Sequence, residues 1–186
     1  MLSYFDLRKG TIFIYQGAPH EVLDFLQMKK AQREGIGQTK LKNLITGQII
    51  FKNFHQNEEF QEAEIEKVKV KFLFSKRDVF YFCLKDDPSF RFELKKEQIG
   101  ESARFLVPNL ILDGIQWEEK IINVSLPIKI QLKVKEAPPG VKGDRAQSGT
   151  KTVVLENGTK IQAPLFIEEG DVIEINTETG EYVRRL

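Results

Sequence analysis

Short segments in which apolar and polar residues alternate follow one another along nearly the whole chain. Residues 67–72 read Lys-Val-Lys-Val-Lys-Phe, and residues 128–134 show the same alternation. Successive side chains of a strand point to opposite faces, so this pattern is typical of strands with one buried face. Segments of this kind are predicted at 11–15, 22–26, 41–44, 48–54, 68–74, 79–84, 110–112, 121–125, 128–134, 151–155, 160–162, 172–176 and 182–184.

Dipeptides that end in glycine separate many of these segments. Glycine adopts positive φ without steric cost, and Asn-Gly or Asp-Gly therefore favours tight hairpin turns. The predicted turns are Gln16-Gly17, Thr46-Gly47, Asp113-Gly114, Asn157-Gly158 and Thr179-Gly180. Many short strands joined by such turns indicate an all-β fold of the sandwich or barrel type. The single good helix candidate is 95–106, where Ile99, Ala103, Phe105 and Leu106 form an apolar stripe.

Two polar or proline-containing clusters, at 56–59 and 125–127, suggest where the chain divides. The expected domains are therefore 1–64, 65–127 and 128–186. Each piece has about the size of a small five- or six-stranded barrel. Because domains this small bury little surface alone, we expect the first two to pack together.

The aromatic residues of the central segment lie on apolar strand faces, and Phe72, Phe74, Phe80 and Phe82 are predicted to be core. Surfaces that bind single-stranded RNA usually combine basic grooves with exposed aromatic rings. The pattern therefore disfavours a general single-strand RNA-binding protein. Cys83, the only cysteine, excludes an intramolecular disulfide and is expected to be a buried thiol.

The charge of the chain is nearly balanced, with 28 Lys and Arg against 27 Asp and Glu. A protein that wraps duplex nucleic acid by charge alone is usually far more basic. The lysines of 67–71 are accordingly interpreted as the solvated face of a strand rather than as an RNA-binding stripe. Charges interrupt every apolar run and no signal peptide is recognisable, so we expect a cytosolic protein without a membrane span.

Motifs for catalysis are missing from the sequence. His20 and His55 lie far apart and outside any metal-binding motif, so neither a metal nor a cofactor is expected. Asp86 and Asp87 precede a proline, which indicates a turn rather than paired catalytic carboxylates. The glycine-containing segment 140–144 lacks the ending of a nucleotide-binding loop; it is either an inter-strand loop or a turn that approaches RNA. An enzyme is not expected.

Motifs at both ends of the chain carry a family resemblance. The N-terminal part has Asp-Leu-Arg-Lys-Gly at 6–10, Gly-Ala-Pro-His-Glu-Val at 17–22 and Thr-Lys-Leu-Lys-Asn-Leu-Ile-Thr-Gly at 39–47. The C-terminal part has Pro-Gly-Val-Lys-Gly-Asp at 139–144, Pro-Leu-Phe-Ile at 164–167 and Thr-Gly-Glu-Tyr-Val-Arg-Arg at 179–185. In this order the motifs resemble bacterial translation elongation factor P, a family homologous to the hypusine-bearing initiation factor of eukaryotes and archaea.

The resemblance implies an SH3-like barrel of the KOW type followed by two OB-fold barrels, arranged like an L-shaped tRNA. It implies a monomer that binds both ribosomal subunits beside peptidyl-tRNA. Such a factor stimulates peptide-bond formation, especially at consecutive prolines, by positioning the tRNA rather than by acid–base catalysis. The RNA-contact residues carried over are Gly143 and Asp144, which face the exit-site codon in the family, with Tyr182 and Arg185 nearer the peptidyl-tRNA. Arg145 stands where the family has threonine, and Tyr182 has an equal alternative role in packing on the barrel.

The largest departure from the family lies in the loop that reaches the peptidyl-transferase centre. Family members read Pro-Gly-Lys-Gly there, whereas this chain has Lys29, Lys30, Ala31, Gln32 and Arg33. The ungapped register places Gln32 at the position of the tip lysine or arginine. Glutamine has neither an amine nor a guanidinium group, so the lysine and arginine modifications of the family cannot occur on it.

Three hypotheses for this tip remain open. Gln32 acts unmodified through hydrogen bonds of its amide, or Arg33 or Lys30 takes the tip position through a shifted loop. In the third hypothesis the tip is degenerate and the protein is a specialised paralogue. Under the resemblance, the cluster of Lys29, Lys30 and Arg33 is expected to contact phosphates of the tRNA acceptor end.

Overall fold

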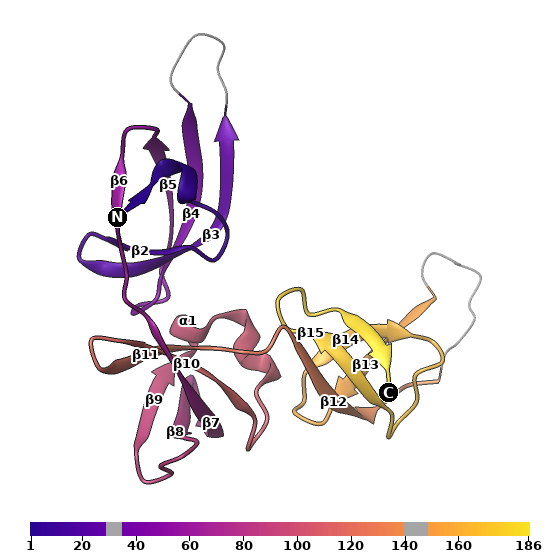
Figure 1. Cartoon of the computed structure of the whole chain (residues 1–186). Helices are drawn as coiled ribbons and strands as arrows, with labels where there is room; N and C mark the ends of the chain where they lie inside the picture. The colour runs from indigo at the N-terminus through magenta and orange to yellow at the C-terminus, as the bar shows by residue number, and fades with distance from the viewer. Residues whose placement is uncertain (29–34, 140–148) are drawn as a thin grey trace.

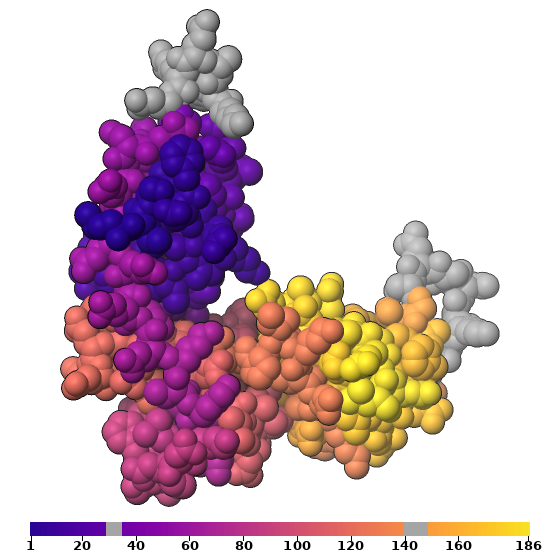
Figure 2. Space-filling view, viewed as in Figure 1, coloured from indigo at the N-terminus to yellow at the C-terminus, as the bar shows by residue number. Residues whose placement is uncertain are grey.

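Three antiparallel sheets form an L in the computed structural model, which describes residues 1–28, 35–139 and 149–186 (Figure 1). The first sheet stands on the second along one limb, and the third forms the other limb (Figure 2). The all-β class and the L-shaped arrangement agree with the sequence-based expectation. The domain limits at 64/65 and 127/128 remain a proposal, which limited proteolysis tests.

The first sheet has the strand order β1-β6-β2-β3-β4-β5. A single 3₁₀ turn, η1 (Tyr4–Asp6), follows the first strand. The strands are β1 (Leu2–Ser3), β2 (Ile12–Tyr15), β3 (Ala18–Met28), β4 (Ile36–Asn43), β5 (Ile49–His55) and β6 (Glu59–Glu62). Alternate apolar residues close over one core, which contains Tyr4, Leu7, Phe13, Val22, Leu41, Phe54 and Phe60.

The second and third sheets share one topology. Their strand orders are β11-β10-β7-β8-β9 and β14-β13-β12-β15-β16, so both have the order 5-4-1-2-3 when read in the same direction. The central strands are β7 (Glu66–Lys76), β8 (Val79–Leu84), β9 (Arg91–Lys95), β10 (Ile111–Trp117) and β11 (Lys120–Ser125). The third sheet has β12 (Lys129–Glu136), β13 (Thr150–Leu155), β14 (Lys160–Pro164), β15 (Val172–Asn176) and β16 (Tyr182–Arg185). A five-stranded sheet with this order is typical of an OB-fold barrel.

The helix predicted over 95–106 is wrong as one element. The chain forms α1 (Lys96–Ile99) and a separate 3₁₀ helix, η2 (Glu101–Phe105), and Lys95 belongs to β9. Gly100 between them has φ of 87°, which interrupts a right-handed helix. The apolar stripe is nevertheless buried, as predicted, at Ile99, Ala103, Phe105 and Leu106.

The turn predicted at Asp113-Gly114 is also wrong, because both residues lie inside β10. A side chain on Gly114 would place its Cβ 2.8 Å from Cγ1 of Val70 on the neighbouring strand. Glycine is therefore needed here for close packing and not for a turn. The other four predicted glycines have positive φ between 76° and 83°.

The predicted core position of Phe74 is wrong as well. Phe72, Phe80 and Phe82 are buried in the central core, but Phe74 is 50% exposed. The pairing of β7 with β8 shifts between Phe72 and Phe74, which marks a β-bulge at Leu73. One extra residue reverses the facing of every later residue on the strand, so Phe74 lies on the outer face.

The first two domains pack together, as expected. Leu44 from the first sheet forms a buried cluster with Ile115 and Ile122 from the second. Asn123, which is 1% exposed, donates from Nδ2 to the carbonyl oxygen of Leu44 at 3.0 Å and to that of Gln98 at 2.9 Å. Apolar contact and paired buried amides together fix the orientation of the first limb.

Phe105 joins the second and third domains. It is the last residue of η2 in the central domain, yet its ring is fully buried in the core of the third sheet beside residues such as Leu132 and Ile173. The carbonyl oxygen of Arg104 accepts hydrogen bonds from Asn157 Nδ2 at 2.8 Å and from Thr159 Oγ1 at 2.6 Å. The corner of the L is therefore held by a buried ring and by hydrogen bonds.

Candidate functional site

The segment that the family resemblance marks as the tip joins β3 to β4. Lys29, Lys30, Ala31, Gln32 and Arg33 lie outside the described residues. The last described pair of the hairpin is Met28 opposite Ile36. These strands run to the end of the first limb (Figure 1).

The base of this hairpin is held by an aromatic contact that the sequence analysis did not identify. The rings of Tyr4 and Phe25 meet edge to face with centroids 5.4 Å apart. Gly37 on β4 lies under both rings, and a Cβ at this position would overlap Phe25 and lie 2.8 Å from Tyr4. The missing side chain therefore lets Tyr4 of η1 pack closely on the hairpin. The closely spaced Gly35 and Gly37 were the available signal in the sequence.

Exposed apolar side chains lead toward the tip segment. Leu26 and Met28 occupy alternate positions at the end of β3 and remain 58% and 37% exposed. Alternate residues of a strand share a face, so the two side chains lie on one side of the hairpin. They extend the candidate contact surface beyond the polar residues that the sequence indicated.

The second candidate segment joins β12 to β13 on the other limb. Gly143, Asp144 and Arg145 lie outside the described residues. Its two ends are anchored, because Lys151 Nζ donates to the carbonyl oxygen of Pro138 at 2.8 Å and Leu165 N donates to that of Gly149 at 3.1 Å.

The remaining two candidates lie on β16. Tyr182 pairs with Ile175 and is half-buried against the core of the third sheet. Arg185 is half exposed, with its guanidinium 3.6 Å from the carboxylate of Asp171 and 5.5 Å from the centroid of the Phe166 ring. An ion pair and a cation–π contact therefore orient Arg185 while leaving much of it open.

The sequence motifs did not nominate Arg184, a further basic residue on this strand. The carboxylate of Glu174, only 8% exposed, lies 3.2 Å from Arg184 and 3.6 Å from Lys129. Two cations around one carboxylate leave a net positive charge on this cluster. The structure thus places Tyr182, Arg184 and Arg185 on one strand, while the β3–β4 hairpin belongs to the other limb (Figure 1).

Within residues 1–28, 35–139 and 149–186, no cluster of three or more His, Cys, Asp or Glu side chains is arranged to hold a metal ion. No helix in these ranges has the length and apolarity needed to cross a membrane.

Comparison with known proteins gives the family. The model of the elongation factor P KOW-like domain matches residues 3–60, and that of the elongation factor P C-terminal domain matches residues 130–185. Elongation factor P of Thermotoga maritima is 40% identical over 185 residues, and the match covers all of both chains. The chain belongs to the elongation factor P family. Within that family, elongation factor P of Moorella thermoacetica is 38% identical over 186 residues, and that of Carboxydothermus hydrogenoformans is 36% identical, each with full coverage of both chains.

Among solved structures, eukaryotic translation initiation factor 5A from Methanococcus jannaschii aligns with 68% of this chain and 90% of its own. The TM-score is 0.47 and the identity 16%. As a member of the elongation factor P family, the chain is a translation factor.

Proposed function

We propose that the protein binds the ribosome beside peptidyl-tRNA and stimulates peptide-bond formation when consecutive prolines stall synthesis. The observation that carries the proposal is the full-length match to proteins named elongation factor P at 36–40% identity. Synthesis takes place in the cytoplasm, where we place the protein as a monomer.

The mechanism is positioning rather than acid–base catalysis. Proline reacts poorly because its ring restricts the conformation of the peptide bond that forms, so a correctly held tRNA lowers the barrier. An L of three domains, with buried contacts at each junction, supports such a role because a rigid body transmits position from one limb to the other. No side chain of this factor is assigned an acid or base role.

Contact residues are proposed at both ends of the L. Gly143, Asp144 and Arg145 approach the exit-site codon, while Tyr182 and Arg185 approach the peptidyl-tRNA. The exposed guanidinium of Arg185, oriented by Asp171, supports a phosphate contact. The half-buried Tyr182 combines packing with a smaller contact surface.

The test is a reconstituted translation assay on a message with consecutive proline codons. Added protein is expected to relieve the stall, and Arg185→Ala is expected to reduce relief. Lys120→Ala, which alters an exposed residue of β11 outside the proposed contacts, serves as the control. Failure of the native protein to relieve the stall contradicts the proposal and leaves the alternatives: a general single-strand RNA-binding protein or a paralogue with a degenerate tip.

The tip is tested separately with Gln32→Ala and Arg33→Ala. If Gln32 acts unmodified, the native protein has the mass of its plain sequence and Gln32→Ala loses activity. If Arg33→Ala abolishes activity while Gln32→Ala does not, the shifted-loop hypothesis replaces the hypothesis that Gln32 acts unmodified. Charge reversal at Lys30 and Arg33 is expected to weaken ribosome binding and to reduce its salt dependence, because cations that contact phosphates release counterions.

A further inference from the structure

Two aromatic rings lie stacked on the outer face of the central sheet. The rings of Phe74 and Tyr81 are nearly parallel, with centroids 4.7 Å apart and an interplanar angle of 21°. Half of Phe74 is open to solvent. The pair is separate from the core, which the neighbouring Phe72, Phe80 and Phe82 fill from the inner face. The stacked pair leaves aromatic surface in water, on which a nucleic-acid base can stack.

Cations surround this pair on both sides. Strand pairing sets Phe74, Tyr81 and Glu93 in one row across β7, β8 and β9. The rows on either side contain Lys76, Val79 and Lys95, and Lys71, Cys83 and Arg91. Four cations therefore face one carboxylate, and the hairpin turn beyond adds the opposite charges of Arg77 and Asp78.

The spacing suits an extended chain of phosphates. Residues two apart on a strand are about 6.8 Å apart, and adjacent strands lie about 4.8 Å apart. Long Lys and Arg side chains reach across such distances, so each neighbouring row lies within reach of the backbone of a nucleotide stacked on the rings.

The location also matches the binding face of the fold. In OB-fold barrels, oligonucleotides and oligosaccharides bind over the second and third strands, which here are β8 and β9. The excess of cations favours the nucleic acid over a sugar. In Figure 1 these strands lie in the central domain, at the corner of the L.

We propose that this face binds single-stranded RNA, with a base stacked on Phe74 and Tyr81 and with phosphates held by Lys71, Lys76, Arg91 and Lys95. The excess of cations is complementary to the phosphates of RNA, whereas an apolar protein partner offers it no opposite charge. The proposal stands on the central sheet alone and does not depend on the action of the factor on stalled ribosomes.

The test measures fluorescence anisotropy of a labelled ten-nucleotide uridine RNA with the full-length protein, in the absence of ribosomes. Phe74→Ala is expected to weaken binding by about 5- to 150-fold, the usual effect of losing one base–ring stack. Phe74→Trp is expected to retain binding, and quenching of the added indole reports stacking directly. Because Phe74 is half exposed, neither substitution is expected to disturb folding.

The control is Phe51→Ala. Phe51 is 79% exposed on β5 and also has a cation above its ring, Lys40 at 5.8 Å, but it lies on the first sheet. Phe51→Ala is expected to leave the affinity for RNA unchanged. An equal loss in Phe51→Ala and Phe74→Ala would show that any exposed ring contributes and would overturn the proposal.

Charge is tested with Lys76→Glu and Lys95→Glu together. Binding of the native protein is expected to fall with salt at a log–log slope of about −2 to −3, since each phosphate contact with a single strand contributes about −0.7. The double variant is expected to flatten this slope. Undetectable binding by the native protein, or self-association in sedimentation that Phe74→Ala abolishes, contradicts the RNA assignment; the latter outcome makes the face a protein interface.

Discussion

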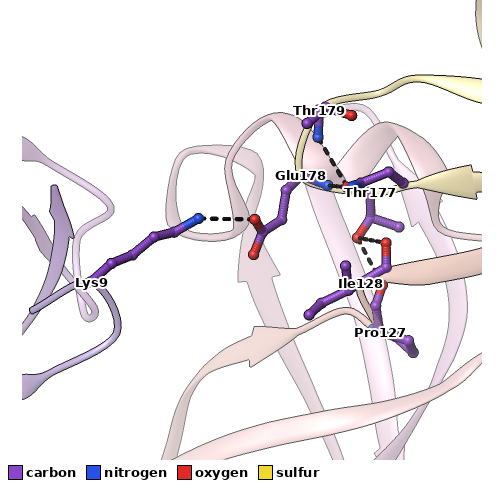
Figure 3. Close-up of polar contacts among 7 residues, drawn as sticks. Lys9, Pro127, Ile128, Thr177, Glu178 and Thr179 are labelled. Carbon is purple, nitrogen blue, oxygen red and sulfur yellow. Dashed lines mark hydrogen bonds and ion pairs between the residues drawn. The ribbon is translucent and has the colours of Figure 1, made fainter.

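Lys9 Nζ lies 2.9 Å from Glu178 Oε2, and this ion pair joins turns of the first and third domains across 169 positions of sequence (Figure 3). The turn that holds Glu178 is itself fixed, because Asn176 Oδ1 accepts hydrogen bonds from the backbone N–H groups of Glu178 and Thr179. Thr177 Oγ1 donates to the carbonyl oxygen of Pro127 at 2.7 Å. A contact between the limbs therefore supplements the junctions at the corner of the L.

Lys9→Glu is expected to increase the distance between the limbs, because like charges then face each other. Both native side chains are more than half exposed, so little change in unfolding free energy is expected. Energy transfer between dyes on the two limbs measures the effect. Adding Glu178→Lys restores opposite charges and is expected to restore the native distance; a double variant as open as Lys9→Glu would contradict a role for the pair.

The same contact has a defined pH dependence. The hydrogen bond from Lys9 to Glu178, together with the charge of Glu178, raises the pKa of Lys9 above its ordinary 10.5. Because the pKa of Lys9 is higher in the folded protein, the contact is fully present at pH values below the ordinary lysine pKa. It is lost as pH rises through the pKa that Lys9 has in the folded protein. Energy transfer is therefore expected to stay constant from pH 7 to about 10 and to fall above 10.5.

Gly47→Ala is expected to destabilise the protein more than Gly17→Ala. Both glycines have positive φ, 81° and 77°, so alanine costs about 1–2 kcal/mol at either position through backbone strain alone. A Cβ at Gly47 also overlaps the carbonyl group of Glu97 in the central domain, whereas nothing lies within 4 Å at Gly17. The extra overlap adds about 1–3 kcal/mol, measured as the difference between the two variants in denaturant unfolding. Equal losses of unfolding free energy in the two variants would show that the junction between the first two domains accommodates the added methyl group without cost.

Local alternation predicted most of the strands because a half-buried strand imposes a period of two on its own sequence. The prediction at 79–84 coincides with β8, and that at 172–176 with β15. Strand β9 alternates too, but its charged residues and the helical pattern that follows concealed it. The strands β1 and β6 have two and four residues, too few for a periodic signal.

Features that depend on another part of the chain were not predicted. The outward position of Phe74 follows from a bulge opposite β8, and the strand position of Gly114 follows from the proximity of Val70. Asn123 gives no local sign that it binds Leu44 of another domain. For the candidate contact residues, sequence motifs were sufficient to nominate Tyr182 and Arg185, but the ion pair that orients Arg185 required the structure.

Phe105→Ala is expected to cost about 3–5 kcal/mol, the usual loss for a fully buried aromatic ring. Because the ring fills the third-domain core from the central chain, hydrogen exchange is expected to accelerate in β12 and β15 more than in β7 and β8. Phe90→Ala, at a 49% exposed position, serves as the control and is expected to change stability by less than about 0.5 kcal/mol. Uniform acceleration over all three sheets would contradict a specific role at the junction.

Glu21 on β3 lies opposite Lys42 on β4. Partial burial disfavours the charged form of both side chains. Burial raises the pKa of Glu21 above its ordinary 4.5 although Lys42 opposes the shift, and burial lowers the pKa of Lys42 below 10.5 although Glu21 opposes it. A carboxyl group with a raised pKa contributes stability below its unfolded pKa, and this contribution is lost as pH rises through the folded value.

Glu21→Gln keeps the shape of the side chain and removes its partly buried charge. The unfolding free energy of the native protein is therefore expected to decline relative to that of the variant as pH rises from 4.5 to 7, the interval above the ordinary glutamate pKa. Urea unfolding at matched pH values measures the difference. Glu62→Gln removes an exposed carboxylate from the same sheet and provides the control for the loss of one negative charge. If the stability of Glu21→Gln and that of the native protein change identically over this interval, the Glu21 carboxylate does not titrate as inferred.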